Sequence, residues 1–207
     1  MSLDPYPRAS TALLMIDPLN DFVCERGKLW PYLKEMAEEV NLVANQKRAL
    51  LGARARGVRV IYVPHRRTEP GDFESFRFLN PTHAASIPIR PFARGEWGGD
   101  WHAELAPEPG EIVVYEHWFQ SGFANTDLDY QLRQHGVDRI VLTGQRTNAC
   151  FESTGRYGAE LGYHVTLLRD ATAAFSREEM QATFVNARTF AHAVCTVDEF
   201  LAALEPA

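Results

Sequence analysis

The chain has 207 residues, of which 45% are hydrophobic and 11% aromatic. These values fit one ordinary globular domain over residues 1–207 and exclude disordered and fibrous classes. Lys and Arg number 21 against 27 Asp and Glu, a formal net charge of −6, so we expect no nucleic-acid partner. No run approaches the roughly 18 apolar residues of a membrane span, and Met1–Ser10 lacks the pattern of a secretory signal, so we expect a cytoplasmic protein without membrane contact.

Short apolar runs rich in Val, Ile and Leu recur along the chain, and each is typical of a buried strand. The runs are Ala12–Ile16, Val58–Val63, Ile112–Val114, Ile140–Thr143, Val165–Leu168 and Ala193–Val194. Segments with helical periodicity lie between most of them and after the last. These segments are Leu33–Arg56, Leu128–His135, Asn148–Leu161, Arg177–Ala187 and Val197–Leu204. The alternation predicts an α/β fold with a mostly parallel six-stranded sheet and helices on both faces.

Residues at the expected helix ends agree with this pattern. Gly57, Gly136 and Gly162 each follow a helical segment, where a left-handed residue is common. Ser176, with Glu179 three residues later, predicts a capping box for the helix that follows.

The segment Pro64–Gly110 has little periodicity, and a stretch of this length in a compact domain is usually functional or disordered. Its aromatic residues are Phe73, Phe76, Phe78, Phe92, Trp97 and Trp101. They favour an ordered excursion near a site.

Three cysteines, Cys24, Cys150 and Cys195, form an odd and widely spaced set. Neither a disulfide framework nor a zinc site with a Cys-x-x-Cys arm has this spacing. At least one thiol is therefore free, and for Cys24 and Cys195 we expect the ordinary role of a small apolar side chain.

Ligands of an open parallel sheet bind beyond the carboxyl ends of its strands, which directs attention to the residues that end them. Asp17 ends the first strand. A partly desolvated carboxylate there is suited to hold or move a proton, and the alternative is a solvated side chain that caps the next turn.

The turn from Gly144 to Cys150 leads from a strand into a helix. Backbone N–H groups at a helix start stabilise a thiolate and can also hold an oxyanion formed on a substrate. The alternative for Cys150 is a buried structural thiol.

A third strand end carries Tyr115-Glu116-His117-Trp118. Glu116 or His117 there is suited to polarise a substrate or exchange protons with the thiol, and Trp118 to form a pocket wall. Solvated side chains are the alternative for both titratable residues.

Four motifs in a fixed order carry a family resemblance. They are Leu-Leu-Met-Ile-Asp-x-x-Asn-Asp-Phe from Leu13, Ser-Gly-Phe-Ala-Asn-Thr-Asp-Leu-Asp from Ser121, Thr-Gly-x-x-Thr-Asn-Ala-Cys ending at Cys150, and Leu-Gly-Tyr-His-Val-Thr-Leu-Leu-Arg-Asp-Ala from Leu161. Together they resemble the isochorismatase-like cysteine hydrolase superfamily over roughly Thr11 to Leu204.

The resemblance implies a Rossmann-like three-layer α/β/α domain, often assembled into homodimers or homotetramers, with an Asp-Lys-Cys triad. Asp17 matches the family's general base and Cys150 its nucleophile. A non-proline cis peptide would fall between Gln145 and Arg146, and the N–H groups of Arg146 and Cys150 would form the oxyanion hole. Many members cleave amide or ureide C–N bonds, including nicotinamidases, carbamoylsarcosine amidases and ureidoacrylate-type hydrolases.

The sequence departs from this pattern at the lysine. Lys28, Lys34 and Lys47 are the lysines of the chain, and none is near the third strand end. Counting forward from the strand places Glu116 at the lysine position, whereas counting back from Phe123 places His117 there. One hypothesis is a proton shared by Asp17 and Glu116, with His117 near the thiol.

Nicotinamidases carry a metal-binding Asp/His cluster after the second strand, and the single His65 does not reproduce it. We therefore expect neither a metal nor another cofactor. The basic residues His65, Arg66 and Arg67 either face an anionic substrate group or form a solvated or salt-bridged loop.

These observations favour a cofactor-free thiol hydrolase of a small amide or carbamoyl compound, with catalytic residues Asp17, Cys150, Glu116 and His117. Expected substrate-binding residues are Phe22, Trp97, Trp101, Trp118 and Asn148; for the aromatic ones, the core or a subunit interface is the alternative. A catalytically weakened binding or redox-sensing protein on the same scaffold is another possibility. Isochorismate-type vinyl-ether hydrolysis is a third, against which the presence of Cys150 counts.

Overall fold

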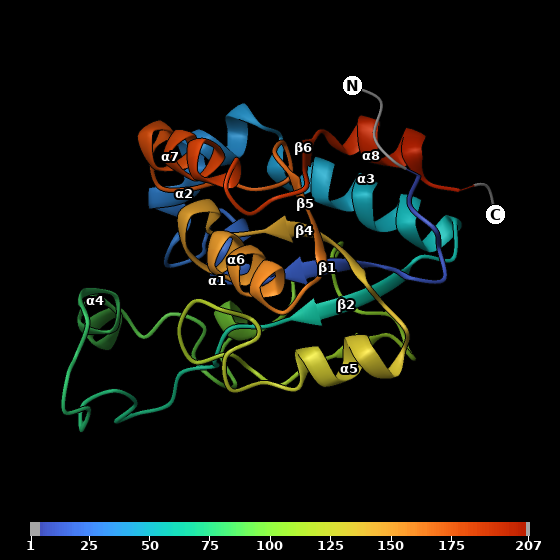
Figure 1. The fold of residues 1–207 in the computed structure, drawn as a ribbon. Coiled ribbons are helices and arrows are strands. Elements are labelled where there is room, and N and C mark those ends of the chain that lie inside the picture. Colours follow the sequence, from blue (N-terminus) through green and yellow to red (C-terminus); the bar gives the residue numbers. More distant parts are fainter. Residues whose placement is uncertain (1–4, 206–207) are drawn as a thin grey trace.

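The computed structural model describes residues 5–205 and contains a six-stranded sheet in the order β3-β2-β1-β4-β5-β6 (Figure 1). Every pair of neighbouring strands is parallel. The strands are β1 (Thr11–Ile16), β2 (Arg59–Val63), β3 (Ile112–Val113), β4 (Arg139–Gly144), β5 (His164–Leu168) and β6 (Ala193–Cys195). The expected α/β class is confirmed. Of the single domain expected over residues 1–207, residues 1–4 and 206–207 lie outside the described part.

Helices cover both faces of the sheet (Figure 1). They are α1 (Asn20–Val23), α2 (Trp30–Glu39), α3 (Leu42–Ala55), α4 (Pro81–Ile89), α5 (Leu128–Gln134), α6 (Glu152–Glu160), α7 (Arg177–Ala187) and α8 (Val197–Ala203). A 3₁₀ turn spans Trp97–Gly99, and a π-helical turn, Thr147–Phe151, precedes α6. No helix within residues 5–205 is long and apolar enough to cross a membrane.

The side chains of β1 divide the core into two layers. Leu14 and Ile16 pack with α5 and with the segment that leads into α6, whereas Leu13 and Met15 pack with α3 and α8. Since successive strand residues point to opposite faces, a strand of six fully buried residues requires helices on both sides. This double cover fixes the position at which β1 ends.

The single helix expected over Leu33–Arg56 is wrong, because the chain forms two helices there. Asn41 adopts a left-handed conformation with φ 51° and separates α2 from α3. The amide of Asn45 donates to the backbone carbonyl of Val40 at 2.8 Å and closes the end of α2. The break lets α2 pack against the segment that follows β1, while α3 packs on the sheet.

Helix ends elsewhere follow the sequence signals closely. Gly57, Gly136 and Gly162 all have positive φ. The Oγ of Ser176 accepts from the backbone N–H of Glu179, whose carboxylate accepts from Phe175, one residue before the cap. The expected capping box is therefore only half formed.

The segment between β2 and β3 is an excursion that contains α4 and the 3₁₀ turn. In Figure 1, α4 lies beyond the ends of the strands, on the left. Phe73 and Phe92 are buried, whereas Phe78 is 81% exposed. The excursion thus brings a short helix to the end of the sheet where ligands of this fold class bind.

Candidate active site

Asp17 directly follows β1 and is fully buried. Its φ is 53°, in the left-handed region, and its backbone N–H donates to the carbonyl of Val63 at 3.1 Å. Gly144 at the end of β4 permits this arrangement, because a Cβ there would lie 2.0 Å from the carbonyl oxygen of Ile16. The two strand ends therefore lie closer together than a side chain at residue 144 would allow.

His117 approaches Asp17 from the segment that follows β3. Its backbone N–H donates to Pro64 at 3.0 Å, and its carbonyl accepts from Arg66 at 2.9 Å, which extends the pairing of β2 and β3. The side chain is fully buried, with Nε2 2.9 Å from Oδ1 of Asp17. His117 is thus the residue that the structure places against Asp17.

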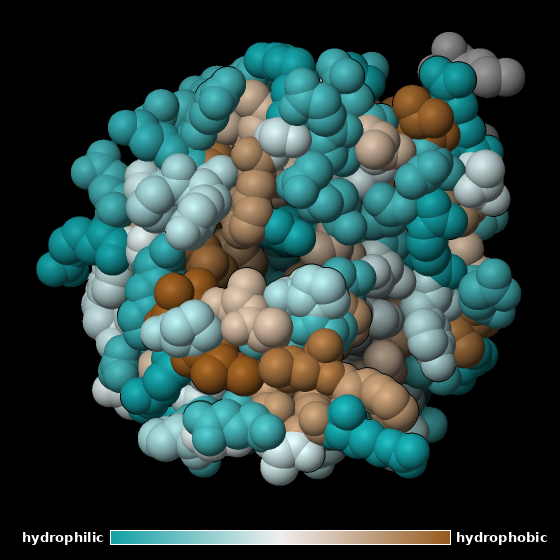
Figure 2. All heavy atoms as spheres, turned by 90° about the vertical axis from the view of Figure 1, so that its left-hand side faces the viewer, coloured by the Kyte–Doolittle hydropathy of each residue, from teal (hydrophilic) through white to brown (hydrophobic). Residues whose placement is uncertain are grey.

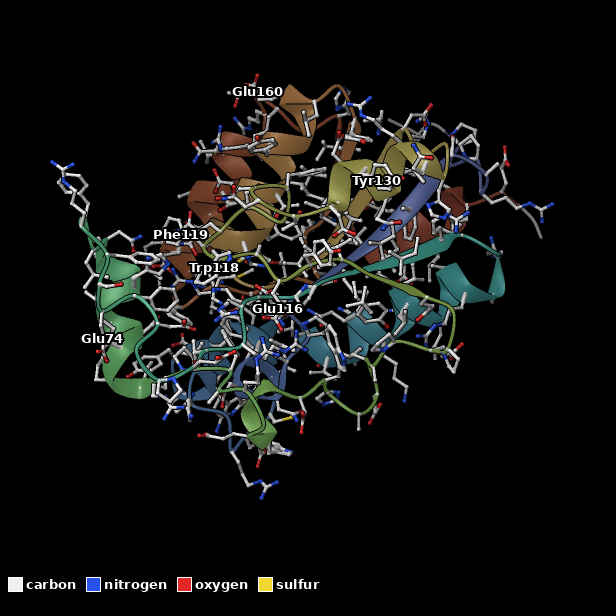
Figure 3. All side chains as sticks on the ribbon, turned by 90° about the horizontal axis from the view of Figure 1, so that it is seen from below. Glu74, Glu116, Trp118, Phe119, Tyr130 and Glu160 are labelled. Carbon is white, nitrogen blue, oxygen red and sulfur yellow. The ribbon has the colours of Figure 1, made fainter. Side chains whose placement is uncertain are left out.

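Glu116 points away from this pair, because neighbouring residues of an extended segment face opposite sides. Its carboxylate accepts from the backbone N–H of Arg67 at 3.0 Å and forms an ion pair with Arg94 at 2.8 Å. Figure 3 labels Glu116 with Trp118 and Phe119 on the loop after β3. The hypothesis of a proton shared by Asp17 and Glu116 does not fit this arrangement.

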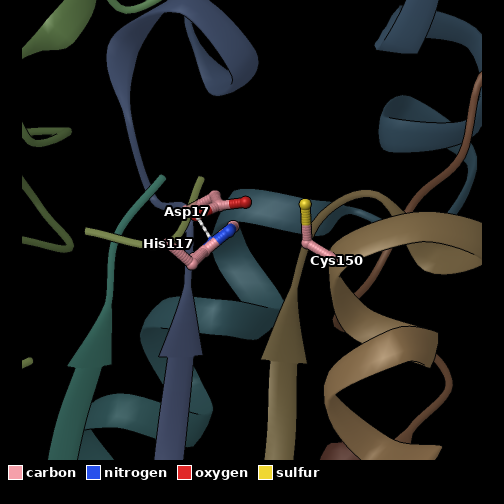
Figure 4. A group of neighbouring side chains, drawn as sticks. All are labelled: Asp17, His117 and Cys150. Atoms are coloured by element: carbon pink, nitrogen blue, oxygen red, sulfur yellow. Dashed lines mark hydrogen bonds and ion pairs between the residues drawn. The ribbon is translucent and has the colours of Figure 1, made fainter. Parts of the chain in front are cut away.

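Cys150 completes the group from the π-helical turn after β4, and it is 5% exposed. Its Sγ, a carboxylate oxygen of Asp17 and a ring nitrogen of His117 all lie within 4.8 Å of one another. Oδ2 of Asp17 accepts no hydrogen bond from the described residues, and Figure 4 shows this oxygen directed toward the sulfur. Three strand ends therefore bring an acid, an imidazole and a thiol together.

The electrostatics of Cys150 differ from the thiolate expected at a helix start. Burial raises the pKa of the thiol well above its usual range, and the neighbouring Asp17 carboxylate raises it further. The guanidinium and backbone N–H of Arg146 oppose this shift and are outweighed. The resting group at neutral pH is consequently the thiol.

The peptide bond between Gln145 and Arg146 is cis, as the resemblance implied. The Gln145 side chain donates to the carbonyl oxygen of Asp17 at 2.6 Å and accepts from Nε2 of Gln46 at 2.8 Å. Gln46 lies on α3, and nothing in the sequence indicated that it supports the site. These two buried amides tie the strand end that carries Asp17 to the turn that carries Cys150.

A cavity of about 470 Å³ opens onto Cys150. Figure 2 shows this end of the molecule, with apolar residues gathered around a hollow. The lining includes Phe22 and Arg146, whose guanidinium lies 4.0 Å from the ring centre of Phe175. Helix α4 supplies much of one wall, and the residues from it are Pro81, Thr82, Ala85, Ser86 and Ile89.

Three expected aromatic walls lie outside this lining. Trp97 stacks with Arg26 and is 40% exposed, Trp118 stacks with Arg66, and Trp101 packs on Tyr62 beneath Arg67. Each indole packs against an arginine or against the core, outside the lining of the cavity.

Asn148 also lies outside the lining, and its Oδ1 is buried without a partner among the described residues. Its sequence neighbour in the turn, Ala149, does line the cavity.

His65 lines the cavity, whereas its two basic neighbours do not. Its Nδ1 lies 3.0 Å from the carbonyl oxygen of Arg66, so this nitrogen carries the proton and donates. Burial, with a further contribution from His117, lowers the pKa of His65 to about 4. Arg66 pairs with Asp72, and Arg67 with Glu116, so the salt-bridged alternative describes these arginines.

Comparison with known proteins identifies the family to which this chain is similar. The isochorismatase domain matches residues 11–199. The ureidoacrylate amidohydrolase RutB of Pantoea ananatis is 35% identical over 201 residues, which cover 92% of this chain and 80% of the relative. A cysteine hydrolase from Pseudomonas syringae pv. phaseolicola has a TM-score of 0.81 and 29% identity, covering 98% of this chain and 95% of its own.

A further structural neighbour is N-carbamoylsarcosine amidase from Thermoplasma acidophilum, with a TM-score of 0.69, 26% identity, and coverage of 91% of this chain and 97% of its own. The family match and these relatives define a hydrolase that acts on non-peptide C–N bonds. The chain belongs to the isochorismatase family, over nearly all of the described residues.

Proposed function

We propose that the protein is a cysteine-dependent amidohydrolase in which Cys150 is the nucleophile and Asp17 its general base. The observation that supports the proposal is that the two carboxylate oxygens of Asp17 have different neighbours. Oδ1 is held by His117 at 2.9 Å, while Oδ2 accepts no hydrogen bond from residues 5–205 and faces the sulfur. A thiol with a raised pKa needs such a base, since little thiolate is present at rest.

In the first half-reaction, Oδ2 of Asp17 takes the thiol proton as Sγ forms a bond with the substrate carbonyl carbon. Backbone N–H groups of Arg146 and Cys150 stabilise the resulting oxyanion. The C–N bond then breaks, and the protonated Asp17 gives its proton to the leaving nitrogen.

In the second half-reaction, water attacks the thioester carbonyl and gives a proton to Asp17. The C–S bond breaks, the product leaves as an acid, and the proton of Asp17 returns to Sγ. The free thiol and the carboxylate are thereby restored.

His117 acts in this scheme as a positioning residue. Its hydrogen bond directs the free oxygen of Asp17 toward Sγ, which is the orienting task of a third group in a nucleophile–base pair. Of the two candidates for the place that the resemblance gives to lysine, His117 contacts Asp17, whereas Glu116 pairs with Arg67.

For the substrate, we propose a small amide or carbamoyl compound with an apolar portion. The relatives named above act on ureidoacrylate and on N-carbamoylsarcosine, and both substrates carry a carbamoyl group on nitrogen. The apolar wall from α4 suits an apolar portion, and Arg146 adds a guanidinium to the lining.

The test is ammonia release from a panel of primary amides and N-carbamoyl compounds, comparing the wild-type chain with Cys150→Ala and the matched variant Cys195→Ala. Cys195 is a buried thiol at the end of β6. Turnover should vanish in the first variant and persist in the second, with both folded by circular dichroism. Full activity of Cys150→Ala would overturn the mechanism.

The redox-sensing alternative requires an exposed thiolate of low pKa, and Cys150 is buried with a raised pKa. No observation in the described residues favours vinyl-ether hydrolysis. A single domain over residues 1–207, a cytoplasmic location and assembly as a homodimer or homotetramer belong to the same proposal. Light scattering after size-exclusion chromatography tests the assembly.

A further inference from the structure

Asp17, His117 and Cys150 together offer a carboxylate oxygen, an imidazole nitrogen and a thiol sulfur. All three side chains are buried, and their ligand atoms lie within 4.8 Å of one another. In residues 5–205 this is the group of His, Cys, Asp and Glu side chains whose atoms are close enough to share a metal ion. Zinc binds this mixture of N, O and S donors, and three protein ligands with one open position is a common zinc arrangement.

We propose that these three side chains bind Zn²⁺ as an inhibitory ligand, with the fourth position open to the cavity. The ion would occupy the nucleophile rather than serve as a resident cofactor. Zn²⁺ binding requires no turnover and is tested separately from hydrolysis, whereas its inhibitory effect rests on the proposed function of Cys150.

The geometry needs only a small adjustment. Zinc lies about 2.3 Å from sulfur and about 2.0–2.2 Å from nitrogen or oxygen, so tetrahedral donors are roughly 3.3–3.8 Å apart. The three ligand atoms now lie within 4.8 Å of one another, and Nε2 of His117 is 2.9 Å from Oδ1 of Asp17. Oδ2 of Asp17 faces Sγ of Cys150 (Figure 4), and this sulfur makes a long contact of 3.8 Å with the carbonyl of Phe119.

Proton balance follows from the same atoms. Binding replaces the proton of Sγ, which leaves to solvent, by a Zn–S bond. The proton on Nε2 of His117 moves to Nδ1, which is buried and accepts no hydrogen bond in the described structure, and Nε2 is then free to ligate.

Charge balance favours the ion in this buried position. A dication out of water requires compensation, and the Asp17 carboxylate with the Cys150 thiolate supplies two negative charges. His117 contributes a lone pair and no charge. A lysine at residue 117 would add a positive charge and no lone pair, so the imidazole at this position is what completes the site.

The experiment titrates the metal-free 207-residue chain with Co²⁺ and then displaces the bound Co²⁺ with Zn²⁺. We expect one Co²⁺ per chain with a sulfur-to-cobalt charge-transfer band, and the band should disappear in Cys150→Ser. His117→Lys and His117→Gln should each weaken Zn²⁺ binding at least about tenfold. Cys24→Ser is the matched control and should behave as wild type, since Cys24 bonds to Asn20 on α1.

A second readout is alkylation by iodoacetamide mapped to each cysteine. Equimolar Zn²⁺ should slow labelling of Cys150 at least tenfold in the wild type and leave Cys24 unaffected, and the slowing should be absent in the His117 variants. Circular dichroism of the metal-free variants tests whether they are folded. Two different substitutions of His117 are used so that the test remains valid if one of them does not fold. Unchanged Zn²⁺ affinity in both variants, or a charge-transfer band that persists in Cys150→Ser, would overturn the proposal.

Discussion

His117 Nε2 lies 2.9 Å from Asp17 Oδ1, and both side chains are completely buried. The hydrogen bond crosses from the segment after β3 to the end of β1, which are not neighbours in the sheet because β2 lies between them. It fixes one carboxylate oxygen and leaves the other directed toward Cys150 (Figure 4). The orientation of the acid therefore depends on a residue from the edge of the sheet.

Removing the imidazole of His117 should leave the Asp17 carboxylate poorly oriented for proton transfer without abolishing substrate binding. We expect His117→Ala to lower kcat by about 100-fold, on the scale of lost proton-transfer catalysis, with little change in KM. His117→Lys, which carries a hydrogen-bond donor at the same place, should recover at least about a tenth of the wild-type kcat. Steady-state kinetics on the amide identified by the ammonia screen provide the measurement, and a normal kcat in His117→Ala would contradict the positioning role.

The pKa of Cys150 predicts a specific pH dependence of alkylation. Burial raises that pKa and the Asp17 carboxylate adds to the effect, so the reactive thiolate forms only at higher pH than in an unfolded chain, where thiols titrate near 8.5. In EDTA-treated protein, iodoacetamide labelling of Cys150 should therefore be slow at neutral pH and increase in alkaline solution.

Asp17→Asn removes the negative charge and should shift this increase to lower pH. Labelling in concentrated urea is the control, because there the three cysteines should react alike. Rapid labelling of Cys150 in the folded wild type at pH 6 would show that the thiolate is stabilised after all.

The difference between Glu116 and His117 illustrates the limit of sequence reasoning at this site. Strand β3 has two residues, so there is no alternating pattern long enough to fix which residue faces inward. A shift by one residue exchanges the two side chains between the site and the surface. The long strands β1 and β4 were predictable from their apolar runs, and Asp17 and Cys150 are placed by the ends of those strands.

The cavity walls were less predictable than the strand ends. Large aromatic residues suggested a pocket, yet Trp97 and Trp118 stack with arginines instead. Helix α4 is short, begins at Pro81 and contains Pro88, and so shows no helical periodicity in sequence. Gln46 gave no signal because a buried amide on a helix becomes meaningful only once its partner, Gln145, is known.

The close approach of β1 and β4 predicts a large cost for a side chain at residue 144. Gly144 has φ 121°, and an added Cβ would lie 2.0 Å from a backbone oxygen of Ile16. We expect Gly144→Ala to lower the free energy of unfolding by about 3 kcal/mol or more, from strain and overpacking. Gly57→Ala is the matched control, because Gly57 also has positive φ but nothing lies within 4 Å of its added Cβ.

Gly57→Ala should lower the free energy of unfolding by about 1 kcal/mol, the penalty of a left-handed conformation alone. Urea denaturation followed by circular dichroism measures both. Equal costs for the two substitutions would mean that the strand ends separate more easily than the structure indicates.

The α4 wall should determine how large a substrate the cavity accepts. Ala85 and Ala84 are neighbours on α4 and both are exposed, but of the two only Ala85 lines the cavity. A phenyl ring at residue 85 occupies space in the cavity that opens onto Cys150, whereas one at residue 84 does not. We expect Ala85→Phe to raise KM for the bulkiest amide in the panel by about tenfold, the effect of a few lost methylene contacts. The KM for the smallest amide should not change. Ala84→Phe should match the wild type for both substrates. If the two variants lower activity equally for small and bulky amides, α4 supports the fold of the site without selecting its substrate.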